Sequence, residues 1–317
     1  MAHIEIENLT FSYPSAGRPS LSNVSLTIRR GEYVVLCGKS GSGKTTLLRH
    51  LKSVLAPHGK RSGDIRINGV SLKDMSQRDQ AAKVGFVMQN PDDQIVTDKV
   101  WHELAFGLES LGCDQKTMRA RVAEMACYFG IQDWFHRDVA NLSGGQKQLL
   151  NLASIMAMQP EILILDEPTS QLDPIAASDF LNTLRKINAE LGTTILIAEH
   201  RVEDIFPYAD RAIVMDGGSY FTRFASLMLP LCRSQLLVLG VFSFTAPWND
   251  LLWPMIVVDS PELRTLPVVL SMYKTTFTVD LPHQMAAASV GVIPMLVFYI
   301  FSQRYFMESV VSSGVKG

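Results

Sequence analysis

The sequence lacks three features that would each point to a particular class of protein. Its 317 residues contain 29 Lys and Arg against 31 Asp and Glu, a net charge of −2, so no basic excess favours nucleic acid as a partner. The four cysteines lie far apart and form no C-x-x-C pair, which favours reduced thiols over disulfides or a zinc site. The first ten residues lack the basic and then apolar order of a signal peptide.

Charge is distributed unevenly along the chain. Residues 219–317 contain only six Lys and Arg and five Asp and Glu, so about 11% of them are charged, against about 22% of residues 1–218. A C-terminal third so poor in charge is typical of a segment in a membrane. We therefore expect two domains, residues 1–218 and 219–317, with the boundary near Gly217–Ser219.

A glycine-rich segment follows a short apolar run, Glu32–Cys37, which is typical of a buried strand. The segment fits the pattern G-x-x-x-x-G-K-[ST], and we expect a helix, Thr46–Leu55, after it. In that order the backbone N–H groups of the loop and the helix N-terminus converge on a phosphate. The alternative is a glycine- and serine-rich turn without function. The residues expected to bind nucleotide here are Gly38, Lys39, Ser40, Gly41, Ser42, Gly43, Lys44, Thr45 and Thr46.

Two of these side chains have specific expected roles. Lys44 is predicted to reach the β- and γ-phosphates, and the Thr45 hydroxyl is predicted to bind Mg²⁺. A second motif, an apolar run Ile162–Leu165 followed by Asp166 and Glu167, predicts a strand ending in two carboxylates. Asp166 is expected to hold Mg²⁺ and Glu167 to act as general base on the attacking water. The alternative for this pair is a solvated turn.

A second possible anion cradle lies about a hundred residues after the first. Ser143, Gly144, Gly145 and Gln146 stand at the predicted N-terminus of a helix, Gln146–Met158. One nucleotide does not need two cradles so far apart in the chain. The simplest explanation is that the second cradle contacts the ATP of a partner subunit.

With these motifs, residues 3–217 resemble the ATP-binding subunit of an ABC transporter. The resemblance implies a P-loop α/β ATPase core with an inserted helical subdomain, about Asp98–Asn141. It implies that Tyr13 stacks on adenine and that Gln89, after the expected strand Val84–Met88, contacts Mg²⁺ and senses the membrane subunit. The resemblance also implies that Asp173 belongs to the loop crossing the dimer interface, and that His200, after the expected strand Thr194–Ala198, contacts the γ-phosphate.

Further segments resemble the energy-coupling-factor (ECF) ATPases in particular. These are Asn90–Val96, Val100–Gly107, Thr169–Asp173 and Ala198–Arg201. This resemblance implies uptake of a vitamin or of a transition-metal ion, with the substrate bound by a separate subunit. The alternative for Trp101–Glu103 is a helix face that packs on its own small domain.

Two apolar runs in the C-terminal third have the length of membrane-spanning helices. Leu236–Val258 contains one charged residue, Asp250, and Met285–Ser302 contains none. The flanking basic residues place both ends in the cytoplasm by the positive-inside rule. We expect the first helix to end near Trp248. The alternative is a pair of buried helices in a soluble core, which the lack of an apolar stripe disfavours.

Residues 216–317 also resemble a different family, the C-terminal end of a carbohydrate ABC importer permease. The resemblance depends on Trp248–Asp250, Trp253–Pro254, Pro261–Pro267 and the terminal Gly314–Gly317. Several permease helices are missing, so the chain has the pattern of a fusion between two transporter genes. The fold class expected is therefore an ABC ATPase core followed by an α-helical segment with two membrane spans.

The expected function is the ATP-hydrolysing subunit of an ECF-like ABC importer, with ATP and Mg²⁺ as cofactors. The expected partners are a second ATPase subunit, a transmembrane permease subunit, a substrate-binding subunit and the membrane, with the ATPase on its cytoplasmic face. Two alternatives stay open: a membrane-anchored nucleotide-binding fragment without productive transport, and the ATPase of a carbohydrate importer. A soluble ABC protein of DNA repair or translation is opposed by the apolar runs and the lack of basic excess.

Overall fold

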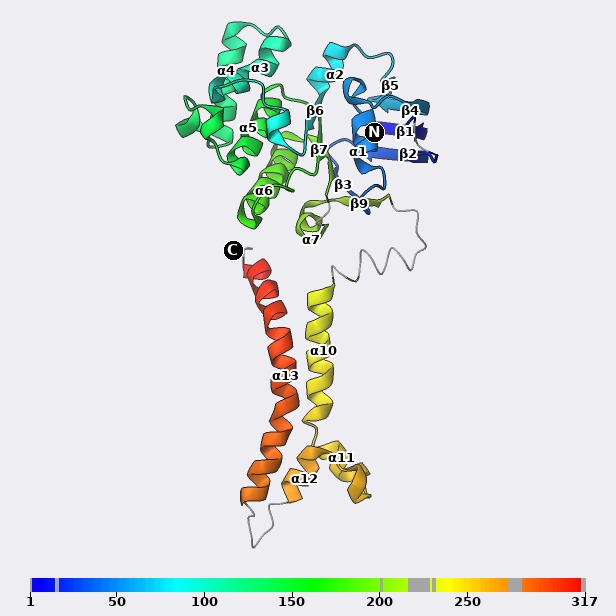
Figure 1. Cartoon of the computed structure of the whole chain (residues 1–317), viewed down its shortest axis with the longest axis vertical. Coiled ribbons are helices and arrows are strands. Elements are labelled where there is room, and N and C mark those ends of the chain that lie inside the picture. The colour runs from blue at the N-terminus through cyan, green and yellow to red at the C-terminus, as the bar shows by residue number, and fades with distance from the viewer. Residues whose placement is uncertain are drawn as a thin grey trace. The chain divides into compact units, whose positions relative to one another are not determined.

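The computed structural model describes residues 2–14, 17–199, 202–215, 229, 232–272 and 281–314 of the chain. By its internal contacts the chain divides into unit 1, Met1–Ser219, and unit 2, Tyr220–Gly317. Figure 1 shows the helices and strands of both units. All the described strands belong to unit 1, so unit 1 is an α/β structure and the described part of unit 2 is α-helical.

A five-stranded sheet forms the centre of unit 1. Every residue of its strands β3, β7 and β8 is buried, as is typical of parallel strands covered on both faces. All neighbouring strands are parallel, so Cys37 and Asp166, at the carboxyl ends of β3 and β7, lie at the same edge of the sheet. The strand order is β6 (Val84–Val87), β7 (Ile162–Asp166), β8 (Thr194–Ala198), β3 (Tyr33–Cys37) and β9 (Arg211–Val214).

A second, antiparallel sheet packs on the same core. Its order is β2 (Leu21–Arg29), β1 (Ala2–Ser12), β4 (Lys60–Ile67) and β5 (Val70–Ser71). Ile4, Ile6 and Phe11 of β1 are buried in one apolar cluster with Leu36 of β3 and Leu47 of the first helix. The antiparallel sheet therefore forms part of the wall around the end of β3.

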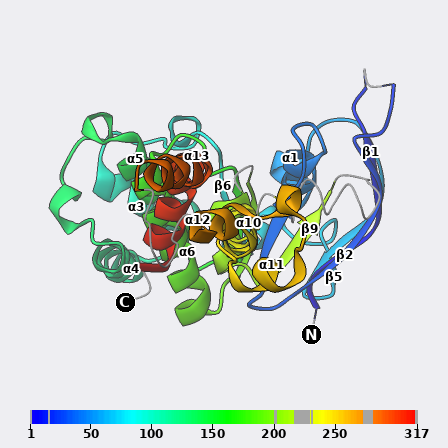
Figure 2. The same ribbon diagram turned by 90° about the horizontal axis from the view of Figure 1, so that it is seen from below.

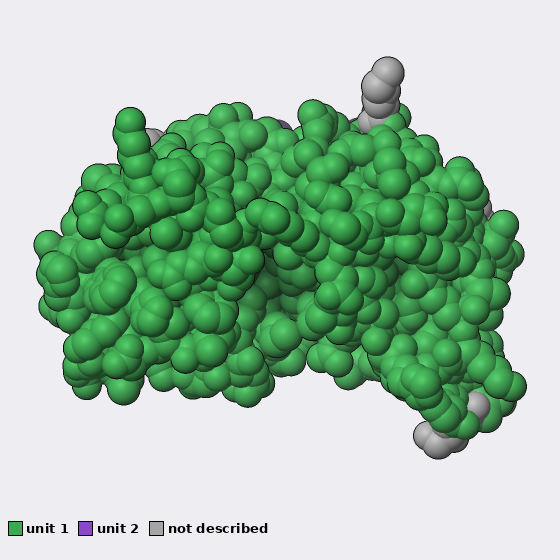
Figure 3. Space-filling model, turned by 90° about the horizontal axis from the view of Figure 1, so that it is seen from above, with its two compact units in different colours: residues 1–219 green, residues 220–317 purple. Residues whose placement is uncertain are grey.

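Unit 1 also contains several α-helices. The helices of this unit are α1 (Lys44–His50), α2 (Gln77–Lys83), α3 (Val100–Ser110), α4 (Gln115–Tyr128), α5 (Gly144–Ala157), α6 (Pro174–Leu191) and α7 (Val202–Ile205). α3 and α4 lie within the predicted helical subdomain, Asp98–Asn141, and pack against α5. Figure 2 shows them on the side opposite the antiparallel sheet, and Figure 3 shows one face of unit 1 with a hollow near its middle.

The predicted helix Thr46–Leu55 was wrong at both ends. α1 begins two residues earlier, at Lys44, because the backbone of Gly43 already serves as its N-cap. It ends at His50, and a separate 3₁₀ turn, Ser53–Leu55, follows. Lys52 between them has an extended backbone, with φ −132° and ψ 108°, which breaks the helix.

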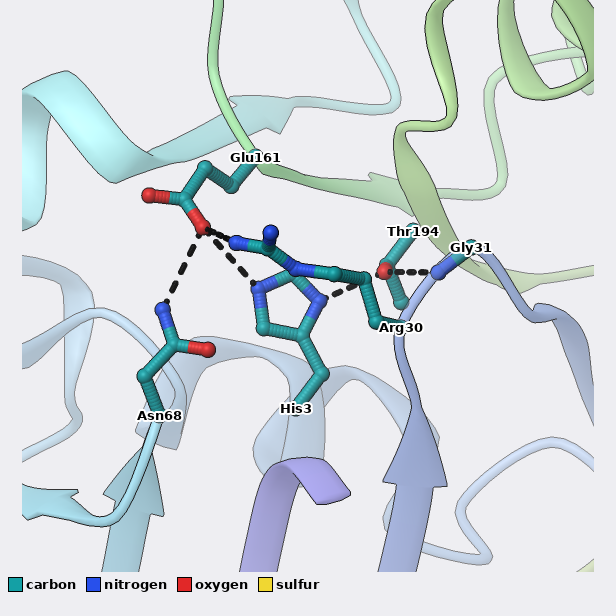
Figure 4. Close-up of polar contacts among 6 residues, drawn as sticks. All are labelled: His3, Arg30, Gly31, Asn68, Glu161 and Thr194. Atoms are coloured by element: carbon teal, nitrogen blue, oxygen red, sulfur yellow. Dashed lines mark hydrogen bonds and ion pairs between the residues drawn. The ribbon is translucent and has the colours of Figure 1, made fainter. Parts of the chain in front are cut away.

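A partly buried polar cluster joins the two sheets at the edge opposite the acidic pair (Figure 4). His3 of β1 is 1% exposed, and its Nδ1 shares a hydrogen bond of 2.6 Å with Thr194 Oγ1 at the start of β8. Its Nε2 lies 3.5 Å from Glu161 Oε2, and Glu161 also forms an ion pair with Arg30. The amide of Asn68 donates to the same carboxylate over 3.2 Å. The cluster fixes β1 against the N-terminal ends of β7 and β8.

Unit 2 contains two long helices that pack against each other, α10 (Arg233–Trp248) and α13 (Leu281–Gly314), with the short helices α11 (Leu252–Val257) and α12 (Leu266–Met272) between them. Trp248 Nε1 donates to the carbonyl of Gly291 over 3.3 Å. A Cβ at Gly291 would lie 2.5 Å from Leu266 Cδ2, so close packing explains the glycine. As predicted, the first helix ends at Trp248, and the backbone of Asn249 caps it.

Among the described residues, one stretch has the length and composition of a membrane span, Leu236–Val257. This stretch contains most of α10, a break and α11. The whole of α10, with 16 residues, is about 24 Å long at 1.5 Å per residue. The apolar run Leu236–Val258 is therefore divided between two helices and is not one continuous helix. The second predicted span lies in α13, where the apolar helical stretch is shorter, Ala288–Val297. The two-span arrangement therefore stays a prediction.

Candidate functional site

The glycine-rich loop connects β3 directly to α1. Gly38, Gly41 and Gly43 have positive φ values of 152°, 81° and 95°. At Gly43 a Cβ would also lie 2.7 Å from the carbonyl oxygen of Ser20, so this position excludes a side chain on both grounds. The cap of α1 has no side-chain hydrogen bond, and its first turn has no acidic residue. The loop and the start of the helix thus present backbone N–H groups suited to an anion.

Lys44 lies across the loop to which it belongs. Its side chain is buried, at 4% exposure, and Nζ donates to the carbonyls of Gly38 over 2.7 Å and of Lys39 over 3.1 Å. A buried ammonium that donates to carbonyls favours a nearby anion. The position suits the predicted role of Lys44 in binding phosphate oxygens.

Thr45 and Asp166 form a pair of oxygen donors. Thr45 Oγ1 donates to Asp166 Oδ1 over 2.9 Å, which joins the first turn of α1 to the end of β7. Burial raises the pKa of the Asp166 carboxyl, the Thr45 hydrogen bond opposes the rise, and the neighbouring Glu167 charge adds to it. A hydroxyl and a carboxylate are the hard ligands that Mg²⁺ prefers, and Mg²⁺ commonly keeps water and phosphate as its other ligands. The pair therefore fits the predicted magnesium site, although no cluster of three His, Cys, Asp or Glu occurs in the described residues.

Glu167 and Gln89 lie beside this pair. Gln89 Nε2 donates to Glu167 Oε2 over 3.3 Å, so the residues after β6 and β7 meet at the edge of the sheet. Glu167 has a φ of 49°, in the left-handed region, where a non-glycine residue is uncommon. This conformation changes the direction of the backbone just after β7 ends, and with it the direction of the Glu167 side chain. The arrangement suits a carboxylate that acts on a water molecule.

Lys44, Thr45 and Glu167 line one cavity of about 250 Å³. Tyr13 is in its wall, and its hydroxyl shares a hydrogen bond of 3.2 Å with Thr46 Oγ1. The cavity thus combines an aromatic ring, the glycine-rich loop and a carboxylate. Its lining residues are Tyr13, Ser20, Ser40, Gly41, Gly43, Lys44, Thr45, Thr46 and Glu167.

The second predicted cradle lies apart from the first. Ser143 caps α5: its Oγ accepts from Gln146 N over 3.3 Å, and its own N–H donates to Gln146 Oε1 over 2.9 Å. The helix therefore begins at Gly144, two residues before the predicted start. The reciprocal bonds between Ser143 and Gln146 place Gly144 and Gly145 in its first turn. Ser143, Gly145 and Gln146 line a different cavity, of about 230 Å³, which shares no lining residue with the first.

The last two predicted site residues have different outcomes. Asp173 caps α6, where its Oδ1 accepts from the N–H groups of Ile175 over 3.0 Å and Ala176 over 2.9 Å. This contact is local, so it leaves a role at a subunit interface as a prediction. His200 lies outside the described residues. Glu199 before it is buried and accepts hydrogen bonds from the backbone and hydroxyl of Thr169, over 3.1 Å and 2.7 Å.

Sequence reasoning missed Ser20 as a neighbour of the phosphate loop. Ser20 precedes β2 and reaches the cavity only because the antiparallel sheet packs beside β3. A local pattern gives no signal for such a contact. The close approach of Gly43 to the Ser20 carbonyl is visible only in the folded chain.

A strand, glycine-rich loop and helix with a hydroxyl–carboxylate pair define a P-loop nucleotide-binding protein. The family model described as ABC transporter matches residues 21–170. An ABC transporter ATP-binding protein of Pyrococcus abyssi is 38% identical over 218 residues, 68% of this chain and 78% of that protein. The chain belongs to the ABC transporter ATP-binding protein family, so its unit 1 is an ABC ATPase domain that binds ATP.

Other relatives and solved structures agree with this assignment. An ABC transporter ATP-binding protein of Bacillus cereus is 49% identical over 218 residues, and the chain spans about two-fifths of its length. The solved structure of cbiO1 from Clostridium perfringens, part of the ABC transporter complex cbiONQ, is 31% identical with a TM-score of 0.61, over 68% of this chain and 85% of that one. A dimeric ATP-binding cassette bound to ADP and Pi is 25% identical with a TM-score of 0.58, over 67% and 93%.

Proposed function

We propose that the chain is the ATP-hydrolysing subunit of an ABC importer of the ECF type, which takes up a vitamin or a transition-metal ion. The observation that carries the ATPase part is the convergence of Lys44, Thr45 and Glu167 on one cavity, with Asp166 bonded to Thr45. The similarity to cbiO1 supports the ECF part. In such a system the transported substrate contacts other subunits, so the site of this chain recognises only the nucleotide.

The side chains divide the work of hydrolysis among them. The loop N–H groups and Lys44 hold the phosphates, and Glu167 accepts the proton of the attacking water as the water approaches the γ-phosphate in line. Gln89 holds the Glu167 carboxylate through its 3.3 Å hydrogen bond. A magnesium ion on Thr45 and Asp166 would neutralise charge on the phosphate oxygens. Tyr13 would stack on the adenine ring.

The second cradle supports an arrangement in a dimer. Because Ser143 and Gly145 line a separate cavity, they are available to the nucleotide of a partner subunit. The proposed assembly is two ATPase subunits, a transmembrane permease subunit and a substrate-binding subunit, with unit 1 on the cytoplasmic face of the membrane. Asp173, at the start of α6, and His200 would complete the interface and the γ-phosphate contacts.

The ATPase proposal is tested on the full chain in lipid or mild detergent. We expect the wild-type chain to release phosphate from ATP in a Mg²⁺-dependent reaction. Lys44→Ala should lose both this hydrolysis and ATP binding. Lys116→Ala, on the exposed surface of α4, is the matched control and should leave both unchanged. Equal hydrolysis by Lys44→Ala would contradict the proposal.

We propose that the chain is a fusion of two domains. Residues 1–218 form the ABC domain, and residues 219–317 form a partial permease segment with two membrane helices. Apolar side chains of its helices are exposed to an unusual extent, among them Leu239 at 62% and Phe242 at 67%, which favours lipid as their surroundings. The full chain should fractionate with membranes, whereas residues 1–218 alone should be soluble. A full chain that stays monomeric in the soluble fraction without detergent would contradict this assignment.

A second candidate function is a membrane-anchored nucleotide-binding fragment without transport. The observation that favours it is that these relatives match about 218 residues, 68–69% of the chain, so their similarity to transporter subunits leaves about a third of the chain unmatched. Coexpression with intact ECF-type membrane subunits separates the two candidates. Copurification and ATP-dependent uptake support the importer subunit, and their absence with intact ATP binding supports the fragment.

A further inference from the structure

Gln148 is a buried amide on α5 that the catalytic account does not use. Its side chain is 1% exposed. Its Nε2 donates to two backbone carbonyls from different elements, Met88 O over 3.3 Å and Pro168 O over 3.1 Å. Two carbonyl oxygens around one nitrogen fix the orientation of the amide, because only the NH₂ end can donate to both.

The two carbonyls have a particular position in the chain. Met88 immediately precedes Gln89, and Pro168 immediately follows Glu167. Gln89 and Glu167 are themselves hydrogen-bonded over 3.3 Å. The NH₂ group of Gln148 thus links the two backbone segments that carry the hydrolytic pair, one residue away from each.

A second amide on α5 strengthens one of these links. Asn151, one helical turn beyond Gln148, donates from Nδ2 to Gln94 Oε1 over 2.9 Å. Gln94 Oε1 accepts in turn from the N–H of Met88 over 2.8 Å, and Gln94 Nε2 donates to Phe86 O over 2.6 Å. The carbonyl of Met88 is therefore bonded to Gln148 of α5 directly, and its N–H is bonded to Gln94, which Asn151 of α5 holds in place. These bonds fix the position of the segment that carries Gln89 relative to α5.

Ser143 of the second cradle caps the start of the same helix. A change in the position of α5 is therefore transmitted through Gln148 to both members of the Gln89–Glu167 pair. If the buried NH₂ group of Gln148 moved away, the carbonyls of Met88 and Pro168 would both lose this donor. Because a buried carbonyl without a donor is costly, the link is stiff rather than adaptable.

We propose that Gln148 is a positioning residue for hydrolysis, which sets Glu167 against Gln89 and links that pair to the helix of the second cradle. The inference deepens the proposed ATPase function and rests on it. Gln148 bonds backbone carbonyls and does not line the nucleotide cavity, so we expect it to act on the rate of the chemical step and not on ATP binding.

The test uses the full chain in lipid or detergent with three variants. Gln148→Met removes the donor at similar length, and Gln148→Glu keeps the shape but donates only when the new carboxyl is protonated. Gln115→Met, on the exposed start of α4, is the control. For Gln148→Met we expect kcat to fall by about 10²-fold, the order of effect of a displacement near 1 Å, while the KM for ATP changes less than about twofold.

The pH profile of Gln148→Glu separates positioning from packing. Burial raises the pKa of a carboxyl, so protonation restores one of the two donated bonds as the pH falls. We expect kcat of this variant, relative to wild type, to rise from pH 8 to pH 6. A kcat of Gln148→Met within twofold of wild type, or a flat relative profile for Gln148→Glu, would overturn the proposal.

Hydrogen exchange gives a readout that does not depend on hydrolysis. Peptides covering residues 84–94 and 162–170 should both exchange faster in Gln148→Met than in Gln115→Met. Protection unchanged in either peptide would overturn the link. A wild-type chain that hydrolyses no ATP would count against the proposed function, while the exchange result would still decide whether Gln148 holds both segments.

Discussion

Thr45 Oγ1 donates a 2.9 Å hydrogen bond to Asp166 Oδ1, which joins residues 121 positions apart in the sequence. One is in the first turn of α1 and the other ends β7. Their oxygens are close enough to serve one cation together. The two motifs found separately in the sequence thus form one site in the fold.

Thr45→Val should weaken magnesium binding. The change removes a hydroxyl ligand and a hydrogen bond to a carboxylate, a loss of about 1.5–3 kcal/mol, so the Mg²⁺ concentration for half-maximal hydrolysis should rise about tenfold or more. The measurement is a Mg²⁺ titration at saturating ATP. Thr27→Val, at an exposed position of β2 away from both cavities, is the control. An unchanged midpoint for Thr45→Val would remove Thr45 from the metal site.

Glu167→Gln should separate binding from hydrolysis. Replacing a positioned general base slows turnover by about 10²–10⁴-fold, whereas the neutral amide leaves the phosphate loop intact. We expect ATP to accumulate on the protein and the dimer to persist. Phosphate release and bound nucleotide are measured on the same sample. If turnover equals that of wild type, the base lies elsewhere, and His200 is the next residue to test.

The stability of unit 1 should fall as the pH decreases below about 6.5. Burial lowers the pKa of His3 below its ordinary 6.5, and the nearby Arg30 charge adds to this, although Glu161 opposes it. In the window below 6.5 the unfolded chain then binds more protons than the folded chain, so stability is full above that window and is lost as the pH falls through it.

His3→Gln removes one source of this dependence. The thermal midpoint of the full chain, measured between pH 7.5 and pH 5.5, should vary less in the variant than in wild type. His50 is also buried with a lowered pKa, so His50→Gln is the companion variant and the double variant should be the flattest. A single His3 variant with the full wild-type slope would show that His3 does not titrate in this way.

Much of unit 1 follows from sequence patterns that are local. β8 has the predicted bounds, Thr194–Ala198, because a fully buried strand is a continuous apolar run. The glycine-rich loop and the Asp166–Glu167 pair are equally local, and the parallel order of β3 and β7 brings them to one edge.

Other features depend on distant contacts and give no local signal. Gln148 looks like an ordinary helix residue in the sequence, and its two carbonyl partners lie 60 and 20 residues away. The helix starts at Lys44 and Gly144 were placed two residues late because backbone caps, not apolar periodicity, determine them. In unit 2 the break after Trp248 was expected, but the apolar composition of the runs did not predict that α13 extends over 34 residues.

The composite site of a dimer is tested most directly by mixing two inactive variants. Lys44→Ala removes the phosphate loop lysine, and Ser143→Arg blocks the second cradle, so neither homodimer should hydrolyse ATP. In a mixed dimer one site keeps an intact loop from one subunit and an intact cradle from the other. We expect phosphate release to return on mixing and to increase with the fraction of mixed dimer. Full hydrolysis by either variant alone, or none after verified formation of mixed dimers, would contradict it.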